Sequence, residues 1–423
     1  MLSHGAHRGF TVEKRRAQVP GLNSNLHLIF MIASFISNAE NLLCDLLSIS
    51  GCSGREREVA EYITRKLLRA GVEPAWIRND DAHRHSSIGG EVGNLVFKTP
   101  GTVPGKRRMF LAHLDTVPLC VGARPVSRGN YLYPADKNTG LGADDRAGTA
   151  AILAVALEIL KHRLPHPPLT FFWTVQEEIG LYGARLAKLG LLGRPRLAFN
   201  FDGGSAEKVS MGATGGYRMD IQIHGIASHA GNAPELGVSA IAIASLAIAE
   251  LHREGWFGKI EKNGHAGTSN VGIIRGGDAT NVITPFVEVH AEARSHDPRF
   301  RRRIIRSIEQ AFQRAARQVR NARRQHGSVK ITGRLDYESF RLPADDPSLL
   351  AAEAAIRKIG GKPLRAISNG GLDANWLTAR GIPTVSLGCG QENAHTPAER
   401  LNLTQFHKAC RIALQLATAT ELA

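Results

Sequence analysis

The sequence contains few cysteines and arranges them in no pattern. Its 423 residues include five, and no two of them form a CxxC pair. The five are Cys44, Cys52, Cys120, Cys389 and Cys410. An odd, scattered set argues against a disulfide framework and against a cysteine-bound structural zinc, and it fits a reducing compartment. We therefore expect a cytoplasmic protein.

Long apolar runs are missing as well. The nearest approach is "LHLIFMIASF", which is too short to cross a bilayer. With the basic "HRGFTVEKRR" before it and "SNA" after it, this run faintly imitates a signal peptide. It also continues directly into "NAENLLCDLLSIS", which indicates the first amphipathic helix of a folded domain. We interpret residues 1–37 as a variable, poorly ordered leader and expect no membrane partner; export is the alternative.

Aromatic residues are scarce, although the net charge of +15 would suit a polyanionic partner. Much of the charge lies in one segment, with ten arginines between Arg299 and Arg324. Apolar residues recur there at helical spacing, which predicts an amphipathic helix with an arginine-rich outer face. No aromatic residues alternate with the arginines on that face, as a stacking platform for single strands would require. We expect a solvated face and no nucleic-acid partner; binding to nucleic acid or to a membrane surface is the alternative.

The pattern of strands and helices divides the chain into two domains, as its length favours. From residue 38 to about 214, apolar strands alternate with helices, which is typical of an α/β domain with a largely buried sheet. Over residues 215–341 the order is strand–helix–strand–strand–helix–strand, the split βαβ (ferredoxin-like) unit of a small α+β domain. The alternation of strands and helices that is typical of an α/β domain returns over residues 342–423. We predict one α/β domain interrupted by an inserted α+β domain.

His113 and Asp115 stand two residues apart at the end of the strand "MFLAHLD". In an extended chain, residues i and i+2 face the same way, so the imidazole and the carboxylate share one side. A histidine that binds a metal usually has its second nitrogen held by a carboxylate or a carbonyl. A buried His–Asp hydrogen bond without any metal would give the same pattern, so this pair alone leaves both readings open.

Other acidic and basic residues also follow apolar strands or precede a helix. They are Asp144 and Asp145 in "GLGADDRAG", Glu177 and Glu178 in "VQEEIG", Asp202 in "FNFDGG" and His395 in "NAHTP". Each has an ordinary explanation when taken alone; one aspartate of the first pair, for example, can be a helix N-cap.

Taken together, these residues indicate a metal site. The carboxyl ends of strands in an α/β sheet are where ligands bind, and carboxylates gathered there would repel one another, at a cost on the order of several kcal/mol. Two divalent cations offset such charge, and a His/Asp/Glu set without cysteine suits zinc, cobalt or manganese. Two metals about 3.5–4 Å apart that share a carboxylate and a water form a hydrolytic arrangement. The second of two adjacent glutamates can then be the general base.

At these residues the chain resembles the M20 metallopeptidases, and within them the peptidase T-like (tripeptide aminopeptidase-like) branch. Eight motifs occur in the family's order between residue 38 and the end of the chain: "HLDTVP", "GADDRAG", "VQEEIGLYGA", "FDGG", "SHAGNAPELGVSA", "GGDATNVITP", "NGGLDANWLTARGIPTVSLGCG" and "NAHTPAERL". The resemblance implies a di-zinc exopeptidase-type catalytic domain with a central mixed sheet. It also implies that residues 215–341 form the family's lid and dimerisation domain.

The resemblance implies two bound Zn²⁺ ions, with Co²⁺ or Mn²⁺ as substitutes. His113 and Asp202 would bind one ion, and Glu178 and His395 would bind the other. Asp144 would bridge the two.

Further roles follow from the same resemblance. Asp115 would orient His113, and Glu177 would be the general base that takes a proton from the water between the metals and later delivers one to the leaving amine. In the lid, His229 would reach the active site of a partner subunit and stabilise the oxyanion. Asn281 and Arg294 match substrate-carboxylate contacts, so the resemblance implies a homodimer that acts on small peptides.

The resemblance favours peptides over other substrates. Aspartate at position 202 is commoner among the family's aminopeptidases and dipeptidases, whereas carboxypeptidases and deacylases more often have glutamate. We therefore predict a di-zinc aminopeptidase or tripeptidase. The alternative is an M20 amidohydrolase or carboxypeptidase that acts on N-acyl or glutamyl conjugates, a branch that "SHAGNAPELGVSA" also resembles. A non-catalytic binding protein should have lost a ligand or the base, and none of these positions is missing.

Overall fold

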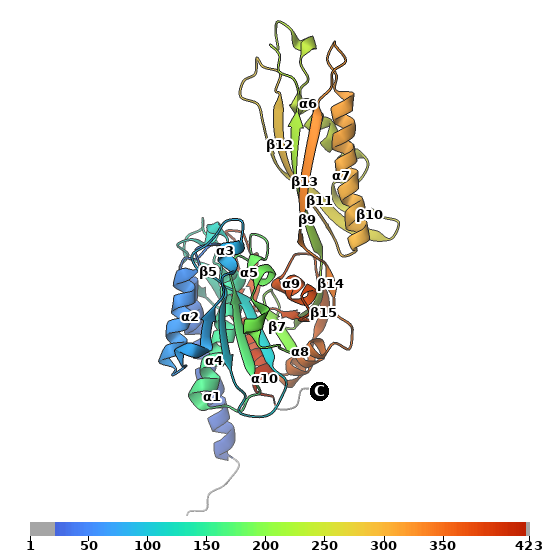
Figure 1. Ribbon diagram of the computed structural model, residues 1–423. Helices are drawn as coiled ribbons and strands as arrows, with labels where there is room; N and C mark the ends of the chain where they lie inside the picture. The colour runs from blue at the N-terminus through green and yellow to red at the C-terminus, as the bar shows by residue number, and fades with distance from the viewer. Residues whose placement is uncertain (1–21, 420–423) are drawn as a thin grey trace, which may run out of the picture.

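The computed structural model describes residues 22–419, which form two bodies joined by a pair of strands (Figure 1). Each body has its own buried apolar core. The larger body contains both the N-terminal and the C-terminal parts of the described chain, and the smaller one extends away from it. Within the described residues, no helix has the length and apolar character needed to cross a bilayer.

The larger body is built on a mixed nine-stranded sheet. Its strands are β1 (Ile77–Asn79), β2 (Leu95–Thr99), β3 (Arg108–His113), β6 (Leu169–Thr174), β7 (Leu197–Phe201), β8 (Lys208–Ala213), β14 (Phe340–Arg341), β15 (Leu364–Ser368) and β16 (Val385–Leu387). The order is β1-β2-β6-β3-β7-β16-β8-β14, with β15 paired to β8. The central strands β6, β3, β7 and β16 are parallel, whereas β2 and β8 run antiparallel to them. The predicted central mixed sheet is therefore confirmed.

Helices cover the sheet, and a small second sheet lies beside it. The helices are α1 (Leu22–Leu47), α2 (Arg57–Arg69), α3 (Ala82–His85), α4 (Ala143–His162), α5 (Tyr182–Leu186), α8 (Pro347–Lys358), α9 (Asp373–Ala379) and α10 (Leu403–Thr418). The second sheet has the order β17 (Gln391–Glu392), β18 (Arg400–Asn402), β5 (Tyr131–Pro134), β4 (Pro125–Arg128). The apolar helix α4 packs against α1, α10 and β3, which places it in the centre of the core.

The first helix begins earlier than the sequence analysis expected. Residues 22–37 were assigned to a poorly ordered leader, but here they form the first part of α1. The physical reason is burial: Phe35 is 1% exposed and belongs to the same core as α4. Residues 1–21 lie outside the described part of the chain, and so does that portion of the leader prediction.

The smaller body, which we call the lid, is an α+β domain with an antiparallel sheet. Its elements are β9 (Gly215–His224), α6 (Ala240–Arg253), β10 (Gly258–Lys262), β11 (His265–Arg275), β12 (Phe286–Ser295), α7 (Pro298–Gln318) and β13 (Ser328–Tyr337). The order β11-β12-β9-β13 is the predicted split βαβ arrangement, and β10 adds an unpredicted edge strand. On α7 the isoleucines face the core and most arginines face outward, as expected. Arg301 is an exception, because it is buried and pairs with Glu338.

The fold brings several polar strand ends together beneath the lid. The parallel strands β3, β6 and β7 are buried along their whole length, and their carboxyl ends reach the same edge of the sheet. The strands β9 and β13 lead from this part of the larger body into the lid (Figure 1). Side chains from both bodies therefore meet at one place.

Candidate metal centre

A cavity of about 430 Å³ lies at the sheet edge, between the larger body and the base of the lid. Seven of the residues singled out in the sequence line it: His113, Asp144, Glu177, Glu178, Asp202, His395 and Arg294. They come from the end of β3, from turns after β6 and β7, from the start of α4, from the loop between β17 and β18, and from β12. The fold thus collects side chains that are far apart in the sequence.

Two histidines face the two oxygens of one aspartate. His113 Nε2 lies 3.3 Å from Asp144 Oδ1, and His395 Nε2 lies 3.4 Å from Asp144 Oδ2. His395 Nε2 is also 2.9 Å from Glu178 Oε1. Asp144 therefore stands between His113 on one side and His395 with Glu178 on the other, as a carboxylate that bridges two cations would.

Donor atoms from these residues form two groups in which all the atoms lie within 4.8 Å of one another. One group contains His113, Asp144 and Glu178, and the other contains His113, Asp145 and Asp202. The second group includes Asp145, whereas the ligand set expected from the sequence included only Asp144 from this pair.

The turn before α4 explains how the two aspartates divide their tasks. Asp144 and Asp145 have non-helical backbone angles, so the regular helix begins after them. Asp145 Oδ1 accepts a hydrogen bond from the backbone N–H of Gly148 at 3.0 Å, which is the capping contact that the sequence left open for one member of the pair. Gly148 is required for close packing, because a Cβ at this position would lie 1.8 Å from the carbonyl oxygen of Phe201.

Asp115 is fully buried behind the cavity and organises its wall. Its carboxylate accepts hydrogen bonds from the backbone N–H groups of Glu177 (2.9 Å) and Glu178 (3.2 Å) and from the hydroxyl of Ser53 (2.6 Å). His113 Nδ1 is nearer the backbone carbonyl of Asp115 (3.0 Å) than its carboxylate (3.5 Å). The carbonyl can only accept, so Nδ1 donates to it and Nε2 is directed to the cavity.

Crowding and burial shift the pKa values of these groups. Burial, together with the charge of Asp144, raises the pKa of Asp202 to about 7. Burial and the neighbouring carboxylates also raise the pKa of Glu177 well above its usual range. Burial would raise the pKa of Asp144 too, but its hydrogen bonds to His113 and His395 hold that pKa below the ordinary value. These buried acids thus repel one another, and the nearby His113 works against the rise in the pKa values of Asp202 and Glu177.

The residues fit a pair of divalent cations. Two imidazoles and several carboxylates, with no thiolate, are the donor types that zinc, cobalt and manganese accept. Added positive charge would also relieve the repulsion that raises the pKa values of Asp202 and Glu177.

Glu399 is a functional residue that the sequence analysis did not identify. It is 1% exposed, and its Oε2 accepts hydrogen bonds from the backbone N–H groups of Leu141 and Gly142, at 2.8 Å each. Its Oε1 accepts the N–H of Asp144 at 3.1 Å. Glu399 therefore holds the turn that presents Asp144, and it lies in the same loop as His395. Glu399 belongs to the motif "NAHTPAERL", in which the sequence predicted a role only for His395.

Two of the predicted lid residues lie away from the cavity. His229 and Asn281 are exposed and lie side by side. His229 forms an isolated antiparallel β-bridge with Val282, and the N–H of Ala230 donates to the carbonyl of Asn281 at 2.9 Å. Neither lines the cavity in the same chain. His229 Nδ1 accepts the N–H groups of Gly231 and Asn232 at 3.1 Å each. The ring proton is therefore on Nε2, which has no hydrogen-bond partner among residues 22–419.

The contacts of Glu399 lead to a prediction about metal affinity. In Glu399→Gln, an amide NH₂ would face backbone N–H groups and loosen the turn that carries Asp144. We expect the affinity for Co²⁺ to fall roughly 10- to 100-fold, measured by chelator competition and the cobalt absorption spectrum. The control is Glu392→Gln, because Glu392 pairs with Arg400 and does not line the cavity. Equal Co²⁺ affinity in the two variants would show that Glu399 does not position the site.

Comparisons with known proteins agree with this geometry. Residues 109–419 match the model of "Peptidase family M20/M25/M40". An uncharacterized protein of Bacillus subtilis, YqjE, is 31% identical over 88% of this chain and 95% of its own length. A Staphylococcus aureus tripeptidase structure superposes with a TM-score of 0.81 at 28% identity, covering 90% of this chain and 98% of that one. The aminopeptidase PepT of Bacillus cereus gives a TM-score of 0.76 at 30% identity, with the same coverage. With a match over most of its length, and with residues from several of that family's motifs lining one cavity, the chain belongs to peptidase family M20/M25/M40, in its peptidase T-like branch.

Proposed function

We propose that the protein is a di-zinc exopeptidase that hydrolyses small peptides from the amino end, as an aminopeptidase or tripeptidase. One observation carries the proposal: Glu177 lines the same cavity as His113, Asp144, Glu178, Asp202 and His395 but is in neither group of donor atoms. His395 is also outside those groups, yet its Nε2 contacts Asp144 and Glu178, whereas the carboxylate of Glu177 has no such contact among the described residues. The names of the similar S. aureus and B. cereus proteins also support peptides as the substrates.

The residues of the chain divide the chemistry among them. His113, Asp144, Glu178, Asp202 and His395 would hold two Zn²⁺ ions, which when bound would polarise the scissile carbonyl and acidify water. Glu177 would accept a proton from water and return it to the leaving amine. Its backbone N–H donates to Asp115, which holds this part of the chain at the cavity wall. Arg294, at the lid side of the cavity, would pair with the carboxylate of the peptide.

A homodimer through the lid would complete the site. His229 and Asn281 do not line the cavity of their own chain, so their proposed roles require a partner subunit. The lid offers a surface for such contact, since Ile241 and Leu246 of α6 are 42% and 40% exposed. In the described residues β10 pairs only with positions 265–269 of β11, which leaves the edge beyond Ser269 open.

We also propose a cytoplasmic location. The five cysteines are all free thiols, and three of them are buried, which suits a reducing compartment.

The amidohydrolase alternative shares the same catalytic residues. An N-acyl amino acid also presents an amide and a carboxylate, so Arg294 and Glu177 would have the same tasks. What favours peptides is Asp202, the residue type commoner in the family's aminopeptidases, together with the similarity to a tripeptidase and to PepT.

The role of Glu177 can be separated from that of a ligand. In Glu177→Gln we expect near-normal zinc content, because Glu177 is outside the donor groups, and a loss of activity of several orders of magnitude. The matched variant is Glu178→Gln, which should lose zinc as well as activity. Zinc content is measured by elemental analysis of the purified proteins. If Glu177→Gln also loses its zinc, the assignments of base and ligand are wrong.

The substrate class is tested by direct comparison. We expect the zinc-loaded enzyme to hydrolyse free tripeptides with a higher kcat/KM than N-acyl amino acids with the same carboxyl-terminal residue. Blocking the peptide amino group by acetylation should reduce hydrolysis of the first bond. An enzyme that cleaves only the N-acyl compounds would instead be the amidohydrolase.

A further inference from the structure

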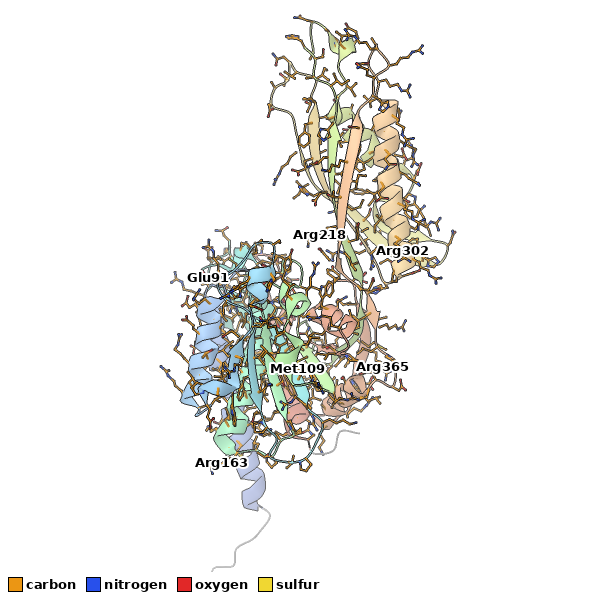
Figure 2. The ribbon with its side chains drawn as sticks, in the orientation of Figure 1. Glu91, Met109, Arg163, Arg218, Arg302 and Arg365 are labelled. Carbon is orange, nitrogen blue, oxygen red and sulfur yellow. The ribbon has the colours of Figure 1, made fainter. Side chains whose placement is uncertain are left out.

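The lid side of the cavity contains a second arginine that the sequence did not single out. Arg218 of β9 lines the cavity together with Arg294 of β12 and Tyr337 of β13. Figure 2 labels Arg218 where the lid meets the larger body. The opposite side of the same cavity is formed by the metal-binding residues, so a bound substrate lies between those residues and two guanidinium groups.

Arg218 is held at one end and free at the other. Its Nε forms an ion pair with Asp336, which is almost completely buried. Within residues 22–419 no protein group accepts a hydrogen bond from the two terminal nitrogens of Arg218, and its side chain is 46% exposed. The planar end of a guanidinium can bind a carboxylate through two parallel hydrogen bonds. Arg218 therefore presents a ready carboxylate-binding group to the cavity.

Arg218 shares its acidic partner with a second arginine. Asp336 is shared, because Arg334 Nε also lies 3.1 Å from its Oδ1. One buried carboxylate thus faces two guanidinium groups, and the carboxylates of Asp220 and Glu292 lie on the adjoining surface. Arg294 differs, since its Nε and Nη2 both donate to Glu292, at 2.9 and 3.0 Å.

The acidic partner of Arg218 is anchored to the larger body. The indole N–H of Trp376 in α9 donates to the backbone carbonyl of Asp336 at 2.9 Å. Asn375 of the same helix donates to the carbonyl of Glu338 at 2.7 Å. The end of β13 is therefore fixed against α9, and Arg218 keeps a defined place relative to the metal-binding residues.

The sheet sets the spacing of the two arginines. Arg218 lies directly opposite Glu292 in the β9–β12 pair, so Arg294 is its diagonal neighbour two residues along β12. Diagonal neighbours lie roughly 7–8 Å apart in an antiparallel pair. Side chains of this length can reach two carboxylates that belong to one amino acid.

We propose that Arg218 and Arg294 together select substrates whose carboxyl-terminal residue is acidic, with Arg294 on the α-carboxylate and Arg218 on the side-chain carboxylate. The inference rests on the proposed peptidase function and names the substrate class of the same cavity. Arg218 acts here as a specificity residue and takes no part in the bond cleavage.

The test compares two tripeptides that differ only in a terminal glutamate or glutamine. The wild-type enzyme should prefer the glutamate peptide by roughly tenfold in kcat/KM, mainly through KM, because a charge-assisted hydrogen bond is lost with the amide. In Arg218→Gln the two rates should become equal, and in Arg218→Lys, which keeps the charge without the planar fork, part of the preference should remain.

Arg334→Gln is the matched control, because Arg334 shares Asp336 but does not line the cavity. It should keep both rates and their ratio. Equal rates for the two peptides in the wild type, or an unchanged preference in Arg218→Gln, would overturn the inference and leave the peptidase function intact. Failure of the wild type to hydrolyse either tripeptide would instead overturn the proposed function.

Discussion

The cavity depends on a balance of charge at the ends of β3, β6 and β7. Asp144, Asp145, Glu177, Glu178 and Asp202 meet there, mostly buried, and His113 and His395 lie among them. Without further cations, burial and mutual repulsion raise the pKa values of Asp202 and Glu177. Burying so many carboxylates together costs folding free energy when no cation neutralises them. The same concentration of negative charge favours the binding of divalent cations.

Two buried carboxylates outside the cavity keep this crowded group in order. Asp115 accepts the backbone N–H groups of Glu177 and Glu178, and Glu399 accepts those of the turn that leads to Asp144. Both act on the backbone, so each fixes the direction of a side chain without occupying the space where substrate and metals would bind. The adjacent glutamates thereby adopt different positions, and only Glu178 lies in a donor group.

The sequence predicted the fold and most of the cavity because both follow from local patterns. Apolar strands that end in acids, and the alternation of strands and helices, place His113, Asp144, Glu178, Asp202 and His395 at one sheet edge. What it missed depends on long-range packing. Phe35 is buried only because α1 docks on α4 and α10, and a local pattern shows no such partner. Glu399 holds a turn about 255 positions away in the sequence, as its contact with Asp144 shows. Arg218 lines the cavity next to its ion-pair partner Asp336, which is more than 100 residues away on β13 and is tied to α9.

The central claim is that this cavity binds two metal ions that share Asp144, and diffraction data collected at the zinc absorption edge test it most directly. Crystals of the zinc-loaded protein should give two anomalous peaks per chain, one on each side of Asp144. One of these peaks should lie next to His113 and the other next to His395. A single peak, or peaks that Asp144 does not contact, would contradict the account.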